Sequence, residues 1–131
     1  MDMKPKVLSR PLDVRARLEE LHSLKNGWLE GGGLAPSHVG LDWLANALEQ
    51  HFPDQLQRPY LFPTPEGGIQ MEWSIEPNDA TLEIDLDIHH SEWHRLNMKT
   101  DGENTKELNL DNPNDWNWLV EQIREMTGDI V

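Results

Sequence analysis

Four carboxylates on two alternating segments are the residues whose types and spacing could do chemistry in this 131-residue chain. Glu72 follows a Pro/Gly-rich turn, and Glu83, Asp85 and Asp87 alternate with apolar residues a few positions later. Because successive strand side chains point to opposite faces, we expect all four on one face of an antiparallel sheet. Such a face could contact a basic protein, hold a divalent cation or catalyse a hydrolysis.

The pairing of the two segments decides how close these charges lie. If Ser74 pairs near Thr81, Glu72 lies opposite Glu83 and Gln70 lies opposite Asp85, with like charges about 5 Å apart. A purely solvated acidic face remains an alternative, because antiparallel sheets are commonly covered on one side only. The apolar residues of the same segments should face the helices: Ile69, Met71, Trp73, Leu82, Ile84, Leu86 and Ile88.

A second group with chemical potential is formed by His89, His90, Glu92 and His94. Imidazoles and a carboxylate suit zinc or another transition metal. However, His89 and His90 are adjacent and would point to opposite faces of a strand. We also expect a turn near Ser91, which would separate the remaining ligands. The sequence therefore predicts no metal site and no cofactor.

The glycine-dense loop around Gly31-Gly32-Gly33 lacks the context of a nucleotide site. A P-loop needs a preceding strand and a following Lys-Ser/Thr, and a dinucleotide fingerprint needs a βαβ unit. We interpret the glycines as a loop that lets Trp28 fold back onto the domain. No Ser-His-Asp arrangement has supporting motif context either, so we assign no catalytic residue and expect no enzyme.

The tryptophans divide into core and candidate contact residues. Trp73 and Trp116 fall on apolar faces and are expected in the core. Trp43 and Trp118 fall beside the main apolar stripes, where tryptophan often marks an interface, although packing at a helix flank is the alternative. With Trp28 they complete the predicted contact set: Glu72, Glu83, Asp85, Asp87, Trp28, Trp43 and Trp118.

The hydrophobic pattern predicts a two-layer α+β domain over residues 13–131. A helix capped by Asp13 should run to about Lys25, and a second should start at the N-cap Ser37. A third should start at Asn112-Pro113. An antiparallel meander of four to five strands should lie between the second and third helices. The expected strands cover residues 59–62, 69–74, 81–89, 93–99 and 106–110.

Composition bounds the function. The formal net charge is −13, which disfavours direct binding to nucleic acid. Residues 1–12 read as an extended arm, and residues 1–17 are basic, so the acidic charge lies in the remainder. There is no cysteine and no apolar run of membrane-spanning length. A cytoplasmic protein with no membrane contact and a basic protein partner is the resulting expectation.

Two motifs resemble a family of small bacterial proteins that occur in toxin–antitoxin and defence-type operons. They are Gly27-Trp28-Leu29-Glu30-Gly31, followed by Ala35-Pro36, and Pro63-Thr64-Pro65-Glu66-Gly67-Gly68-Ile69-Gln70-Met71-Glu72-Trp73. The likeness spans about residues 13–125 and departs at Glu30, where Asp is more usual. It implies a protein-binding module such as an antitoxin or immunity-like inhibitor. A small metal-dependent hydrolase using Glu72, Glu83 and Asp85, or a nucleic-acid-mimicking inhibitor, are the alternative functions.

Overall fold

The computed structural model describes residues 14–128 as an α+β fold with three helices and one five-stranded antiparallel sheet. The elements are α2 (Val14–His22), α3 (His38–His51), β1 (Tyr60–Pro63), β2 (Ile69–Ile75), β3 (Asn78–Ile84), β4 (His90–Asn97), β5 (Gly102–Asn109) and α4 (Pro113–Gly128). The predicted class and element order are therefore confirmed. The predicted arm over residues 1–12 and the Asp13 cap lie outside the described residues.

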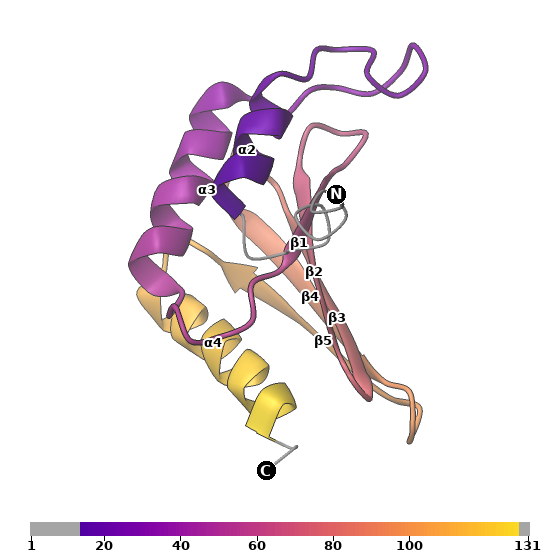
Figure 1. Ribbon diagram of the computed structural model, residues 1–131, viewed down its shortest axis with the longest axis vertical. Coiled ribbons are helices and arrows are strands. Elements are labelled where there is room, and N and C mark those ends of the chain that lie inside the picture. The colour runs from indigo at the N-terminus through magenta and orange to yellow at the C-terminus, as the bar shows by residue number, and fades with distance from the viewer. Residues whose placement is uncertain (1–13, 129–131) are drawn as a thin grey trace, which may run out of the picture.

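The sheet is a meander in which each strand pairs with its neighbour in the sequence, in the order β1-β2-β3-β4-β5. Figure 1 shows all three labelled helices on one side of this sheet. Short turns join the strands from β2 onward, and such connections permit only antiparallel pairing. One face of the sheet is thus directed toward helices and the other is not.

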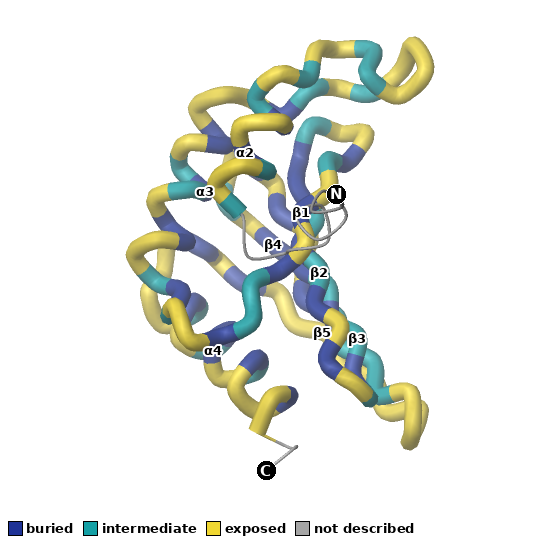
Figure 2. Tube along the Cα trace, viewed as in Figure 1, coloured by how far each residue is buried: buried dark blue, intermediate teal, exposed yellow. Residues whose placement is uncertain are grey.

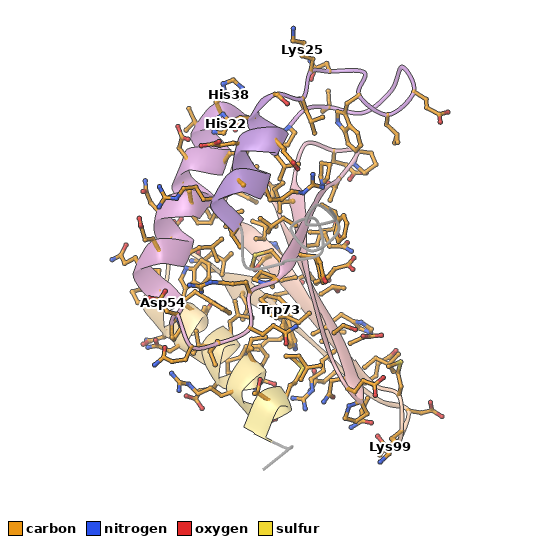
Figure 3. The ribbon with its side chains drawn as sticks, in the orientation of Figure 1. His22, Lys25, His38, Asp54, Trp73 and Lys99 are labelled. Atoms are coloured by element: carbon orange, nitrogen blue, oxygen red, sulfur yellow. The ribbon has the colours of Figure 1, made fainter. Side chains whose placement is uncertain are left out.

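Period-2 alternation separates the two faces. Along β2, Ile69, Met71, Trp73 and Ile75 are buried, and the residues between them are not. Trp73 lies between the sheet and the helices (Figure 3), and its indole Nε1 donates to the carbonyl of Gln57 at 3.1 Å. Figure 2 shows the resulting alternation of buried and exposed positions along the strands. The apolar face of the sheet and the helices together form one core.

α3 and α4 start and pack as the sequence indicates, whereas α2 ends at His22 and not near the predicted Lys25. Ser37 caps α3, because its Oγ accepts from the backbone N–H of Gly40 at 2.9 Å. On α3, Leu41, Leu44 and Leu48 are buried against the core. On α4 the buried residues are Trp116, Leu119, Val120, Ile123 and Met126. Each amphipathic helix therefore contributes one apolar stripe to the same core.

The predicted third strand was too long. β3 ends at Ile84, and the chain turns over residues 85–89 before β4 begins at His90. Leu86 is buried as expected, but Ile88 is 65% exposed, so its predicted place under the helices is wrong. The reason is the turn: Asp85 accepts at its Oδ1 from the backbone N–H of Asp87, and His89 has a positive φ of 62°. The turn expected near Ser91 is also wrong, since Ser91 is a buried β4 residue.

The predicted pairing of β2 with β3 was displaced by two residues. Glu72 pairs with Thr81, and Gln70 pairs with Glu83. The connection between these strands is the short Glu76–Pro77 turn, so β3 starts at Asn78 rather than near Thr81. A shift of two leaves every side chain on its predicted face, because the strand period is two. Glu72 is therefore not opposite Glu83.

Across residues 14–128, no helix combines the length and apolar character that crossing a bilayer requires.

Candidate protein-binding surface

The sheet face that points away from the helices carries most of the charge of the sheet. We call it the open sheet face and derive its members from the strand alternation and registers. They are Tyr60, Phe62, Gln70, Glu72, Ser74, Asp79, Thr81, Glu83, His90, Glu92, His94, Leu96, Glu103, Thr105, Glu107 and Asn109. Six of these described residues are carboxylates and none is Lys or Arg.

A row of three glutamates crosses this face. Glu83 pairs with Glu92, and Glu92 pairs with Glu107, so one carboxylate stands on each of β3, β4 and β5. All three are exposed. Side chains directly opposite each other on one face lie about 5 Å apart, and like charges there are destabilising. The fold therefore keeps a local arrangement that costs stability.

Several carboxylates on the face have polar neighbours. His94 Nε2 lies 3.4 Å from Glu103 Oε2, and His90 Nε2 lies 3.3 Å from Glu107 Oε1. Gln70 Nε2 donates to Glu72 Oε2 at 2.6 Å. Among the described side chains, no Lys or Arg forms an ion pair with the row of Glu83, Glu92 and Glu107. Within residues 14–128, the negative charge of this face is thus largely uncompensated by Lys or Arg.

A hollow of about 320 Å³ lies at one end of this row. It is lined by Glu66, Gly67, Gly68, Glu83, Ile84, Asp85, Leu86, Asp87, His90 and Glu92. Asp85 and Asp87 belong to the β3–β4 turn and not to a strand, which corrects their predicted place on the sheet. Asp85 accepts from the backbone N–H groups of Asp87 at 2.8 Å and Ile88 at 3.4 Å. Its carboxylate therefore holds the turn that lines the hollow.

The two motifs of the family resemblance meet beside this hollow. The backbone N–H of Leu34 donates to the carbonyl of Pro65 at 2.8 Å, and Leu34 forms an isolated bridge with Glu66. Trp28 folds back on its own loop, where its Nε1 donates to the Leu34 carbonyl at 2.8 Å. Gly33, with a φ of 88°, leaves room for the indole. The glycine loop and the β1–β2 turn therefore form one continuous end of the molecule.

The three candidate tryptophans do not form one surface with the acidic residues. Trp43 packs against the core and stacks on His89, with ring centroids 3.7 Å apart. Trp118 meets Trp93 edge-on at 5.9 Å on the helix-covered side, with the ammonium of Lys106 over its ring at 5.3 Å. Trp28, Trp43 and Trp118 are each partly buried. On the open sheet face, the exposed aromatic residues are instead Tyr60 and Phe62 of β1.

The histidine group is dispersed by the structure. His89 turns toward α3 and bonds Asp111 through Nδ1 at 2.7 Å, whereas His90 and His94 project from the open sheet face toward glutamates of β5. Within the described part of the chain, no group of three His, Asp or Glu side chains has the arrangement of a metal site.

A second hollow of about 430 Å³ separates α2 from α3 and from the segment before β1. Most of the charged residues that line it form ion pairs with one another. Arg15 contacts Glu49 at 3.2 Å, and Arg58 contacts Asp54 at 2.7 Å. This hollow therefore presents less unpaired charge than the open sheet face.

Of the six carboxylates on this face, the sequence predicted Glu72 and Glu83, and it did not predict Asp79, Glu92, Glu103 and Glu107. In the sequence, Glu92 stands out only as a potential metal ligand beside the histidines. The segment holding Glu103 and Glu107 has one buried residue, Leu108, so its alternation between buried and exposed positions could not be read from hydrophobicity. The available signal was the meander itself, which must place a fifth strand beside β4.

No protein-family model matches the chain, and searches of curated proteins and of solved structures give no significant match.

Proposed function

We propose that this chain is a protein-binding module that takes a basic partner protein on its open sheet face. The observation that carries the proposal is the face's charge: six carboxylates and no Lys or Arg among its described residues. A surface of one sign attracts a partner of the opposite sign and accelerates their encounter. The exposed rings of Tyr60 and Phe62 on the same face add the aromatic surface typical of interfaces.

The row of Glu83, Glu92 and Glu107 supports a binding role over a merely solvated face. Solubility needs negative charge, but it does not need like charges directly opposite each other on three neighbouring strands. A basic partner would remove this repulsion on binding. The residues we place in the contact are therefore Glu83, Glu92 and Glu107, flanked by Glu72 and Glu103.

The specific form we favour is an antitoxin or immunity-like inhibitor that acts in the cytoplasm. The family resemblance supports it, and the absence of cysteine suits a reducing compartment. Blocking a basic groove requires no catalytic group, which agrees with a surface of carboxylates on a rigid sheet. A partner that itself binds nucleic acid is one member of this class.

The test begins with isolation of the partner from the native host, followed by association kinetics at several salt concentrations. The test variant carries Glu83→Gln, Glu92→Gln and Glu107→Gln. Asp85 is left unchanged because its carboxylate holds the β3–β4 turn. We expect association of the variant to be roughly tenfold slower at low salt, with the difference shrinking as salt screens the charges.

A matched control variant carries Glu19→Gln, Glu49→Gln and Glu121→Gln, which removes the same charge from exposed helix positions. The control should associate nearly as fast as the wild type, because these residues lie away from the open sheet face. If both variants associated equally slowly, the slower association would be explained by the net charge of the protein and not by the open sheet face. A test variant that binds like wild type at every salt concentration would exclude the acidic face as the contact.

A further inference from the structure

The two edge strands of the sheet, β1 and β5, differ in how much of their outward-facing backbone is covered by other parts of the protein. β1 has only four residues, is flanked by Pro59 and ends at Pro63. Its Leu61 carbonyl accepts from Arg17 Nε of α2 at 2.9 Å, so this edge is partly covered. β5 has eight residues, and all but Leu108 are exposed (Figure 2). The long edge is therefore the one available for pairing.

Along an edge strand, alternate residues bond the neighbouring strand and the residues between them direct their N–H and C=O groups outward. One hydrogen bond at the end of β5 shows which residues are which. The N–H of Leu110 donates to the carbonyl of His89 at 2.9 Å, which fixes the even-numbered residues as those bonded to β4. The N–H and C=O groups of Glu103, Thr105 and Glu107 consequently point away from the sheet. After them the edge closes, because the N–H of Asn109 donates to Asp115 Oδ2 at 2.7 Å.

We propose that this β5 edge binds a strand of the partner protein, in antiparallel pairing with Glu103, Thr105 and Glu107. The inference rests on the proposed function and adds the mode of binding and the sequence pattern of the partner. Main-chain hydrogen bonds supply affinity in such strand addition, and alternate side chains supply specificity. The added strand extends the open sheet face by one strand beside the glutamate row.

The charges select a basic strand as the occupant. Side chains of Glu103 and Glu107 stand on the open sheet face, and residues paired with them would lie about 5 Å away on that face. The matching partner residues are two lysines or arginines four positions apart, with one residue between them on the same face. That residue lies opposite Thr105.

A second copy of this chain fits the edge poorly. Pairing of two β5 strands centred on Thr105 would set Glu103 of one copy opposite Glu107 of the other, twice. It would also join two acidic sheet faces into one. Like charges directly opposite are destabilising, so the edge disfavours self-association and favours a partner of opposite charge.

The probe is the capped heptapeptide Thr-Lys-Val-Thr-Val-Lys-Thr, measured against the full chain by amide chemical shifts and titration. We expect the largest shifts, and slowed hydrogen exchange, at the amides of Glu103, Thr105 and Glu107. N-methylation of the central threonine removes a bond to β5 and should weaken binding about tenfold or more. N-methylation of one valine, whose N–H points away from β5, should leave affinity nearly unchanged.

The protein variant Thr105→Pro tests the same edge from the other side. Its lost N–H faces outward, so the bonds to β4 remain, and proline is tolerated at such edge positions. Thr105→Val keeps the N–H and is the control. Weakened binding by Thr105→Pro alone supports strand addition. Equal affinities of the two methylated peptides, or of the two variants, would overturn it, as would no binding of the heptapeptide at low salt.

These outcomes separate the inference from the function on which it rests. If Thr105→Pro binds the isolated partner like wild type, but the Glu83, Glu92 and Glu107 amide variant does not, the acidic face remains the contact and strand addition is excluded. If the amide variant also binds normally, the proposed function itself fails.

Discussion

The imidazole of His89 lies flat against the indole of Trp43, with ring centroids 3.7 Å apart and planes 5° apart. The same imidazole bonds Asp111 Oδ1 through Nδ1 at 2.7 Å. One side chain thus joins the β3–β4 turn to α3 and to the segment between β5 and α4. Because this turn lines the acidic hollow and sets the start of β4, His89 positions the glutamate row without belonging to it.

Substitution of His89 should change the stability of the fold in two ways, through loss of the ring contacts and through the backbone conformation. The backbone matters because the φ of His89 is 62°, in the left-handed region. A β-branched residue is strained in this left-handed conformation by about 1–2 kcal/mol, whereas glycine is not. Both substitutions lose the stacking, worth about 0.5–1.5 kcal/mol. We expect His89→Val to be less stable than His89→Gly by about 1 kcal/mol or more in urea unfolding, after allowance for the entropy of glycine. Equal stabilities would contradict the left-handed conformation.

The end of β3 could not be predicted from hydrophobicity, and Ile88 shows why. Leu86 is buried although the strand has already ended, and the apolar–polar alternation of the sequence continues through Ile88 without a break. What ends the strand is local polar chemistry: Asp85 accepts from two backbone N–H groups of the turn. An alternating aspartate is compatible with an exposed strand position and with a turn, so the alternation alone does not show where the strand ends.

The predicted cross-strand partner of Glu72 was wrong, but its predicted face of the sheet was right. The two predictions depend on different features of the sequence. The face on which a strand side chain lies changes only when the pairing register shifts by an odd number of residues. Here the register of β2 and β3 differs from the predicted one by two residues, so the faces are unchanged. Which residue lies opposite Glu72 depends on the length of the turn between β2 and β3. The sequence Glu76-Pro77-Asn78-Asp79 fits either a two-residue or a longer turn, so it does not fix that length. The shared face of Glu72 and Glu83 was thus predictable from the sequence, but the row of Glu83, Glu92 and Glu107 required the registers of three strands.

Glu92 stands between two glutamates, so neutralising it should stabilise the fold. We expect Glu92→Gln to raise the free energy of unfolding by about 0.2–1 kcal/mol at low salt. The gain should shrink as salt increases, because the exposed charges are screened. Urea unfolding at two salt concentrations measures this. Glu49→Gln is the control, since Glu49 pairs with Arg15 and its loss relieves no repulsion. A variant no more stable than wild type would show that the row is not strained.

Gly40 is required where α3 meets the β3–β4 turn. A Cβ at this position would lie 2.7 Å from Leu86 Cβ and 2.8 Å from Ser37 Oγ. We therefore expect Gly40→Ala to lower stability by about 1–3 kcal/mol in chemical unfolding, as overpacking of a close contact does. Gly128→Ala is the control, because a Cβ there has no neighbour within 4 Å among the described atoms. Comparable stabilities of the two variants would mean that the helix and turn are not in close contact.

Arg95 is a charged residue of the helix-covered side, and its side chain is only 13% exposed. It pairs with Glu125 at 2.9 Å, and its Nε donates to the buried Asn78 Oδ1 at 3.1 Å. The Nδ2 of Asn78 has no partner among the described residues. The hydrogen bond from Arg95 Nε to Asn78 Oδ1 is therefore the one that satisfies the buried side chain of Asn78 among the described residues.

Arg95→Met should lower the free energy of unfolding by about 1–3 kcal/mol, because it leaves the Asn78 oxygen buried and unpaired. Removing both polar groups should cost less than the sum of the single changes, since a pair of apolar replacements leaves no buried polar atom. A double-mutant cycle of Arg95→Met and Asn78→Leu, followed by urea unfolding, measures the coupling. Additive effects of the two substitutions would show that the two side chains do not depend on each other.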